Sequence, residues 1–187
     1  MLDFDQSVTW QVLEKRIAET DSARQRAIMQ TVLAHMKAEA DADLDGLMNT
    51  LVADPQYHTW TAAGDTGPKG YDAVRKFYAD FIAGGGAILV SPIDRLVVDD
   101  DSLVNEATMT TLGSWRVARS RGYAIPEDRG HYALRMRIVN LWTFDENALA
   151  YGEDAFVAID PSDFDHLADD ELPKVYIDYL RSIGHEV

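Results

Sequence analysis

The first third of the chain repeats its apolar residues at the spacing of amphipathic helices. A short stripe lies within residues 7–19, and a longer one begins after Thr20-Asp21-Ser22, whose side chains can cap a helix, and continues to about Ala40. A third stripe occupies residues 44–51 and is closed by Asp54-Pro55. This pattern predicts three helices ahead of the first strand.

Strand-like patterns begin after this helical region. Residues 57–61 are rich in β-prone side chains, whereas residues 71–83 return to helical spacing and end at Gly84-Gly85-Gly86. From Ala87 onward the spacing is that of strands until a last helical stripe at residues 171–183. We predict strands at residues 57–61, 87–98, 103–112, 131–144 and 149–159.

The segment from His131 to Phe144 shows the cleanest alternation in the chain. One of its faces is almost wholly apolar, which is typical of a long antiparallel strand with one side on a core. Asn140 is the one strongly polar residue on that face. Burying its amide costs free energy unless a partner satisfies it, so it predicts either a structural hydrogen bond or a contact with a ligand.

The composition indicates one domain. A chain of 187 residues that is 47% hydrophobic can fill a single core, and we find neither internal repeats nor a second core pattern. The chain has no cysteine, which excludes disulfides and thiolate metal sites, and its histidines lack the spacing of zinc ligands. We therefore expect no cofactor and no metal.

The net charge bears on which partners the protein can bind. With 32 acidic and 17 basic residues the formal charge is −15, which disfavours binding to nucleic acid and to anionic membranes. The sequence has no run of the ~20 apolar residues that a membrane helix needs, and its start does not resemble a signal peptide. We expect a cytoplasmic protein.

The order of these elements carries a family resemblance. Helices come first, then one strand, a helix and a series of long antiparallel strands, which is an α+β layer architecture. In this order the chain resembles the nuclear transport factor 2-like superfamily and, within it, the SnoaL-like polyketide cyclase relatives. The segments that carry the likeness are HMKAEADADLDGLMNTLVADPQYHTW (35–60), GYDAVRKFYADFIAGG (70–85), LVVDDDSLVNEATMT (96–110) and YALRMRIVNLWTFDENALAYGEDAFVAID (132–160).

The resemblance implies a cone-shaped α+β fold. A curved antiparallel or mixed sheet would wrap around the N-terminal helices and enclose a central pocket for a small, mostly apolar molecule, usually in a homodimer. The whole chain, 1–187, would form this one domain, with helical extensions at residues 1–22 and 165–187. Relatives include isomerases, dehydratases, epoxide hydrolases, aldol-type cyclases and plain binding modules, so the fold does not fix the function.

Two departures from the family pattern bear on mechanism. Polyketide-cyclising relatives carry an aspartate late in the last strand, in a pattern like GE-x-x-Y-x-D. Here Gly152-Glu153 matches its start, but Phe156 and Ala158 occupy the aromatic and aspartate positions. Relatives resembling scytalone dehydratase carry an aspartate at the end of the first pocket helix, where this chain has Ala40. Any acid–base chemistry must therefore use other residues.

Three residues are candidates for proton transfer. Glu39 lies near the apolar stripe of the long helix, as either a pocket base or an exposed helix-end residue. His58 shares a strand face with Trp60 and has the pKa range of a proton carrier, although a strand histidine is more often packed or on the surface. Glu106 lies in mid-strand as either polar pocket lining or a cross-strand partner of Arg135 or Arg137.

A second group of candidates would line the ligand pocket. Each is equally consistent with ordinary core packing. The group comprises Trp60, Tyr78, Tyr132, Asn140, Trp142 and Phe156.

Three hypotheses about function remain open at this stage. The first is a cofactor-free lyase, isomerase or cyclase that moves protons on a hydrophobic carbonyl or cyclic substrate, with Asn140 or a tyrosine polarising the carbonyl. The second is a non-catalytic small-ligand-binding module, which the two missing carboxylates favour. The third is a structural protein whose sheet serves assembly.

Overall fold

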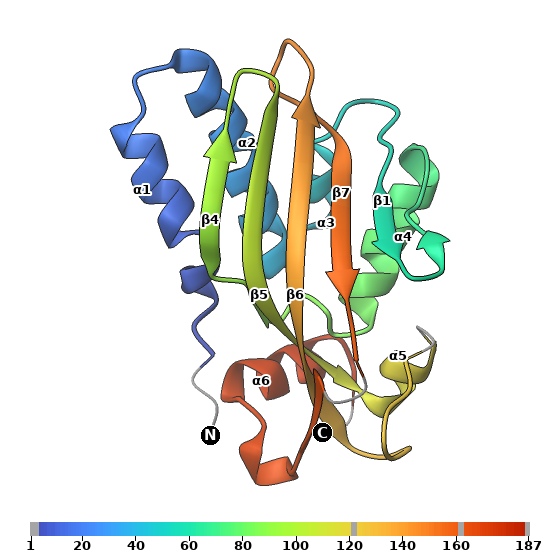
Figure 1. The fold of residues 1–187 in the computed structure, drawn as a ribbon. Coiled ribbons are helices and arrows are strands. Elements are labelled where there is room, and N and C mark those ends of the chain that lie inside the picture. Colours follow the sequence, from blue (N-terminus) through green and yellow to red (C-terminus); the bar gives the residue numbers. More distant parts are fainter. Residues whose placement is uncertain (1–3, 121–122, 161–162, 186–187) are drawn as a thin grey trace.

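The computed structural model describes residues 4–120, 123–160 and 163–185, except for the side chains of Ser120 and Ala158. It is an α+β fold, as the sequence predicts (Figure 1). The helices are α1 (Gln11–Glu19), α2 (Ala23–Ala40), α3 (Leu44–Met48), α4 (Tyr71–Ala83), α5 (Trp115–Ser120) and α6 (Lys174–Ser182), with 3₁₀ turns at Gln6–Thr9 and Asp169–Glu171. The strands are β1 (His58–Thr61), β2 (Gly64–Asp65), β3 (Leu89–Val90), β4 (Ile93–Val98), β5 (Ser102–Ser114), β6 (His131–Phe144), β7 (Ala150–Ala158) and β8 (Phe164–Leu167).

The strands form one curved, open and mixed sheet. Its order is β2-β1-β7-β6-β5-β3, with β4 added along the upper part of β5 and β8 along the lower part of β6. Strand β1 runs parallel to β7, whereas the other pairs are antiparallel. The cone-shaped α+β fold implied by the family resemblance is confirmed.

Local chemistry positions the long helix α2 behind this sheet. The Ser22 hydroxyl accepts a hydrogen bond from the Gln25 N–H and caps the helix start. The guanidinium of Arg24 then donates to the backbone carbonyls of Asp100 and Asp145, at the tips of the two long hairpins. The start of α2 is thereby held against the upper end of the sheet.

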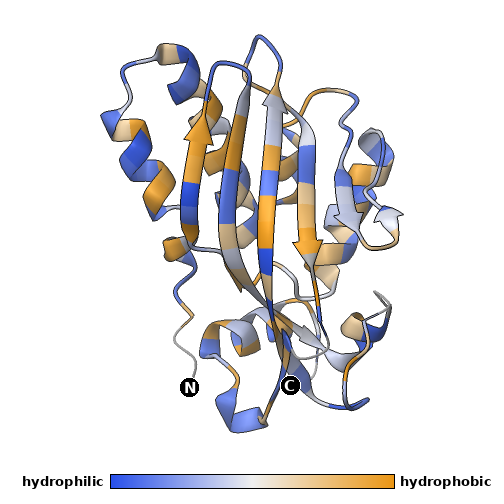
Figure 2. Ribbon diagram, in the orientation of Figure 1, coloured by the Kyte–Doolittle hydropathy of each residue, from blue (hydrophilic) through white to orange (hydrophobic). Residues whose placement is uncertain are grey.

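The two faces of the sheet differ in what covers them. Helices α2, α3 and α4 lie behind the sheet in Figure 1, and we call the face that they cover the inner face. Leu103 of β5 and Trp142 of β6 lie opposite each other on this face and share a core cluster with Ile28 and Val32 of α2. Hydrophilic and hydrophobic residues follow each other along β5 and β6 (Figure 2).

The lower end of the sheet, as drawn in Figure 1, is covered on both sides. On the outer side, Tyr176 and Leu180 of α6 pack with Leu112 and Ala133. On the inner side, α5 and β8 form a separate cluster with β6, which includes Ala118, Tyr132, Leu134 and Phe164. No helix among the described residues is long and apolar enough to span a membrane.

The predicted elements differ from the structure in three segments. The strand predicted at residues 87–98 is split into β3 and β4 around Pro92, because proline has no N–H to donate to a neighbouring strand. The stretch at residues 113–130, for which we predict neither a helix nor a strand, contains α5, and the stretch between residue 159 and the last predicted helix contains β8. The division into one domain with two terminal extensions stays a prediction.

One close contact sets the position of β1. The Gln56 N–H donates to the Tyr151 carbonyl over 2.7 Å, and a Cβ at Gly152 would lie only 2.0 Å from the Gln56 carbonyl oxygen. Glycine alone allows this approach. The resulting register pairs His58 with Asp154, so the side chains of both point to the same, outer face.

We expect Gly152→Ala to lower the free energy of unfolding by about 1–3 kcal/mol, because its Cβ would overlap the backbone of Gln56. This corresponds to a fall in Tm of several degrees for a domain of this size. Thermal unfolding followed by circular dichroism measures it. Gly113→Ala is the matched control, because its Cβ would have no neighbour nearer than 3.9 Å. Equal melting of Gly152→Ala and wild type would contradict the close approach.

Candidate functional site

Four polar side chains form a buried hydrogen-bonded chain between the helices and the sheet. His35 of α2 places Nδ1 2.7 Å from the Thr50 hydroxyl and Nε2 2.8 Å from the Tyr78 hydroxyl of α4. The Tyr78 hydroxyl lies 2.9 Å from that of Tyr57, just before β1. The His35 ring also packs edge-on against Trp142 of β6, at 5.0 Å between centroids. The chain thus joins two helices to the sheet.

The Thr50 hydroxyl sets the direction of this chain. It donates its single proton to the Leu47 carbonyl at 2.7 Å, so it must accept from His35. His35 therefore carries its proton on Nδ1, and its Nε2 accepts from Tyr78. The Tyr78 oxygen then accepts from the Tyr57 hydroxyl. We assign the tautomer from this count of donors.

Every member of the chain is uncharged at neutral pH. Burial lowers the pKa of His35 to about 3, so its ring is neutral. Burial raises the pKa of Tyr57 and of Tyr78 well above that of a free phenol, and the nearby Glu39 and Glu153 raise both further. The phenols consequently keep their protons and can act as hydrogen-bond donors.

Two glutamates lie near this hydrogen-bonded chain, one on α2 and one on β7. Glu39 lies four residues after His35 on α2, which places both on one helix face. Glu153 of β7 lies opposite Trp142 of β6 and therefore shares the inner face of the sheet with it. Both glutamates are partly exposed, unlike His35. Together, Glu39, Glu153, His35, Thr50, Tyr57 and Tyr78 make up what we call the polar cluster.

The environment favours the protonated form of both glutamates. Burial raises the pKa of Glu39 to about 7. Burial, and then the charges of Glu39 and Asp154, raise the pKa of Glu153 to about 8. At neutral pH the pair can therefore offer one carboxylate and one carboxylic acid, which is the combination needed for general acid–base chemistry.

Two asparagines lie beside the polar cluster on the inner face. Asn105 of β5 and Asn140 of β6 are directly paired in the sheet. The Asn105 side-chain oxygen accepts from the indole N–H of Trp142 at 3.3 Å. The Asn140 oxygen Oδ1 is buried and finds no hydrogen-bond donor among the described residues. An unsatisfied buried acceptor of this kind costs about 1–3 kcal/mol.

A small cavity lies farther down the same inner face. Its volume is about 30 Å³. It is bounded by the glycine turn after α4, by α5, and by the lower parts of β5, β6 and β8. The lining residues are Gly86, Thr111, Leu112, Gly113, Val117, Ala118, Tyr123, Tyr132, Leu134 and Phe164. The cavity is therefore apolar and is separate from the polar cluster.

The structure places five of the predicted site residues on the inner side. Glu39 and Tyr78 belong to the polar cluster, and Asn140 and Trp142 lie beside it. Tyr132 lines the lower cavity, and its hydroxyl donates to the Glu127 carbonyl at 2.8 Å. Their roles in catalysis or ligand binding stay predictions.

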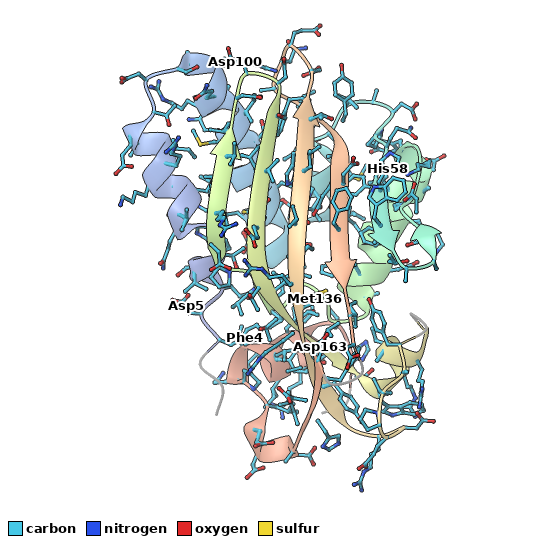
Figure 3. The ribbon with its side chains drawn as sticks, in the orientation of Figure 1. Phe4, Asp5, His58, Asp100, Met136 and Asp163 are labelled. Atoms are coloured by element: carbon cyan, nitrogen blue, oxygen red, sulfur yellow. The ribbon has the colours of Figure 1, made fainter. Side chains whose placement is uncertain are left out.

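Three predicted residues instead form an aromatic stack on the outer face. His58 stacks on Trp60 at 5.9 Å between ring centroids, and Trp60 stacks on Phe156 at 6.3 Å. The expectation that His58 and Trp60 face the central pocket is corrected by the β1–β7 register, which turns Tyr57 inward instead. Figure 3 shows His58 at the β1 side of the sheet, where its Nδ1 lies 2.8 Å from an Asp65 carboxylate oxygen.

Glu106 also lies on the outer face. Its carboxylate forms ion pairs with Arg137 of β6 and, at 3.2 Å, with Arg95 of β4. The hydrogen bond from Arg137 is the main cause of a pKa below the usual range of glutamate. Of the two alternatives that the sequence leaves open for Glu106, the structure contains the cross-strand ion pair. The structure does not bring Glu106 or His58 together with Glu39.

Four members of the polar cluster, His35, Thr50, Tyr57 and Glu153, are absent from the sequence-based candidates. His35 stands between Val32 and Met36 in the apolar stripe of α2, and this position is the signal that could have identified it. Glu153 is marked only by the match of Gly152-Glu153 to the family pattern, and Thr50 and Tyr57 have no comparable signal. Among the described residues, no group of three or more acidic or histidine side chains is arranged to hold a metal ion.

We expect His35 to remain neutral, with its proton on Nδ1, down to about pH 5, where a histidine at its usual pKa is mostly protonated. The reason is that the buried ring donates to the Thr50 hydroxyl and accepts from the Tyr78 hydroxyl. The ¹⁵N chemical shifts of the two ring nitrogens measure both properties. A doubly protonated ring, or a proton on Nε2, would contradict the assigned direction of the chain.

Several solved structures share this fold. A protein from Jannaschia sp. CCS1, assigned to the SnoaL-like polyketide cyclases, has a TM-score of 0.56 and 16% identity, over 74% of this chain and 90% of that chain. The epoxide hydrolase/cyclase-like enzyme SalBIII, of pyran ring formation in the polyether salinomycin, has a TM-score of 0.52 and 10% identity, over 82% and 98%. An LEH-like epoxide hydrolase of M. tuberculosis has a TM-score of 0.53 and 13% identity, over 74% and 86%.

These identities are low, so the neighbours establish the fold alone. A comparison with curated proteins finds no match. The SnoaL-like domain family, in contrast, matches residues 32–151, which include the second half of α2, the polar cluster except for Glu153, and the whole of β5 and β6. Because this match covers more than half of the sequence, the chain belongs to the SnoaL-like domain family.

Proposed function

We propose that this protein is a cofactor-free lyase, isomerase or cyclase that moves protons on a hydrophobic carbonyl or cyclic substrate. The observation that carries the proposal is the pair of inward-facing glutamates, Glu39 and Glu153, whose pKa values are raised to about 7 and about 8. Raised carboxyl pKa values in an enclosed site are typical of catalytic acids and bases. Epoxide hydrolase and cyclase-like enzymes of the same fold support this class of reaction.

The two glutamates would have different roles. Glu39, with the lower pKa, would act as the base and take a proton from the carbon next to the substrate carbonyl. The electron pair of that C–H bond would move onto the carbonyl oxygen, and the protonated Glu153 would donate its proton to that oxygen. Tyr57 and Tyr78 would add neutral hydrogen-bond donors without introducing a competing charge.

The inner face would select an apolar substrate. Between Asn140 and the lower cavity, β6 presents Ile138, Met136 and Leu134 on this face, and all three are buried apolar residues. Six residues of strand span roughly 20 Å, so the path from the cavity to the polar cluster would accommodate an extended hydrocarbon. Methionine side chains rearrange easily, which would let this path open.

A non-catalytic binding module is the alternative. One observation favours it. Ala40 stands where relatives resembling scytalone dehydratase carry an aspartate, so this chain lacks that acid and has Glu39 one residue earlier. A protein that only binds would hold the same apolar molecule without exchanging its protons. The experiment below separates these two functions.

We expect the protein to catalyse exchange of the α-hydrogens of decan-2-one for deuterium in heavy water, and Glu39→Gln and Glu153→Gln each to slow it by about 10²–10⁴-fold. Mass spectrometry of the recovered ketone measures the exchange. The rate should peak between pH 7 and pH 8, where Glu39 is ionised while Glu153 keeps its proton.

Two further variants test the outer-face candidates with the same assay. His58→Gln and Glu106→Gln should leave the exchange rate unchanged, because neither side chain reaches the inner face. Glu19→Gln, at the exposed end of α1, is the neutral control. If wild-type protein binds the ketone but does not exchange its hydrogens, the binding module is the better description.

The raised carboxyl pKa values also predict how stability depends on pH. A folded-state pKa above the ordinary value near 4.5 means that the folded protein binds these protons more tightly than the unfolded chain. Stability is therefore greatest below about pH 4.5 as far as these groups are concerned, and it falls as the pH rises through 7 and 8.

We expect Glu153→Gln, which mimics the protonated form, to melt close to wild type at about pH 5 and at a higher temperature than wild type at about pH 9. Thermal unfolding at the two pH values measures the difference. Glu106→Gln provides a control of opposite sign, because the lowered pKa of Glu106 stabilises the folded state above the ordinary glutamate pKa. A uniform shift of Glu153→Gln at both pH values would contradict the raised pKa.

A further inference from the structure

The buried side-chain oxygen of Asn140 has no hydrogen-bond donor among the described residues, although a strand pairs with Asn140 on each side. On one side β5 places Asn105 opposite it; the Asn105 oxygen accepts from the indole of Trp142, and the Asn105 amide nitrogen does not donate to Asn140. On the other side β7 places Ala155 opposite it, which has no polar side chain. Buried side-chain oxygens in folded proteins are nearly always hydrogen-bonded, so the exception at Asn140 calls for a donor from outside the described residues.

The position of Asn140 relates this missing donor to the polar cluster. Asn140 lies two residues before Trp142 on β6 and on the same face, and Trp142 pairs with Glu153 on β7. Asn140 and Glu153 are thus diagonal neighbours on the inner face, with Cα atoms roughly 7–8 Å apart across the two strands. A ligand whose reacting carbonyl lies against Glu153 would extend past Asn140 toward the apolar lower part of β6.

We propose that the ligand of this site carries a hydrogen-bond donor, a hydroxyl or an N–H, close to its reacting carbonyl, and that Asn140 Oδ1 accepts from it. This inference rests on the proposed function for the position of the ligand on the inner face and of its carbonyl against Glu153. It refines the role that the sequence suggests for Asn140. An amide oxygen cannot polarise a carbonyl by donating to it, but it can select a hydroxylated or amino-substituted ligand over its unsubstituted analogue.

The same chemistry makes Asn140 a specificity residue rather than a structural one. Replacing an unsatisfied buried acceptor by an apolar group of similar shape is nearly neutral or stabilising, whereas removing a satisfied one destabilises. Asn140→Leu should therefore change ligand preference and leave folding intact. Asn105→Leu, in contrast, should lower Tm, because it leaves the buried Trp142 indole N–H without its acceptor.

The experiment compares the binding of 3-hydroxydecan-2-one (the alcohol), whose hydroxyl next to the carbonyl can donate a hydrogen bond, with that of decan-2-one (the ketone), which cannot donate one. Isothermal titration calorimetry measures both dissociation constants on the full-length chain. Wild type should bind the alcohol roughly three- to tenfold more tightly than the ketone. Asn140→Leu should bind the two equally and melt no lower than wild type, and Asn140→Asp, which keeps an acceptor at the same place, should retain the preference.

Three results would overturn the inference. The first is a preference for the alcohol that persists in Asn140→Leu. The second is a wild-type protein that favours the ketone or binds neither compound. The third is a fall of several degrees in the Tm of Asn140→Leu, which would mean that the Asn140 amide has a partner within the protein. The deuterium-exchange assay is independent of these results. Alcohol preference without exchange refutes the proposed acid–base function alone, whereas exchange without alcohol preference refutes the role of Asn140 alone.

Discussion

The desolvation of two carboxyl groups is the constraint on which the rest of this structure depends. Charged carboxylates are costly in a protein interior, and the cost appears here as raised pKa values of Glu39 and Glu153. Among the described residues, no cation contributes to the pKa shift of either glutamate. Arg95 and Arg137 instead pair with Glu106 on the outer face. The sheet thus keeps its ion pairs on one side and its uncompensated acids on the other.

The neutral hydrogen-bonded chain makes this arrangement tolerable. His35, Tyr78 and Tyr57 satisfy one another and end at the Thr50 hydroxyl, so each of these buried polar groups has a partner without bringing a charge near the glutamates. A protonated histidine in the place of His35 would lower the glutamate pKa values by its positive charge. The neutral state of His35 is therefore linked to the protonation state of the two acids, although His35 touches neither of them in the described contacts.

The helical spacing and the strand alternation predict the α+β class and most of the elements, and the family resemblance implies the cone shape, whereas the site could be predicted only in part. The stripe of α2 and the alternation of β6 repeat over many residues, and each repeat reinforces the others. The orientation of β1 depends instead on one close contact, at Gly152, between segments almost a hundred residues apart. No local pattern encodes such a contact. This is why His58 rather than Tyr57 was expected in the pocket, since a single-residue change of parity exchanges the two faces.

The site also shows why a shared fold leaves chemistry open. At the end of α2 the inward acid is Glu39, one residue before the alanine at the position of the family aspartate, and the acid on β7 is Glu153, near the start of the strand. An inward-facing acid on a helix and another on the sheet can thus arise at different positions, because the inner face offers several inward residues at each level. In this chain both acids lie where a charge is costly. Side chains such as Glu39, Glu153 and Asn140, rather than the fold, therefore decide which groups bear that cost and which substrate the site would fit.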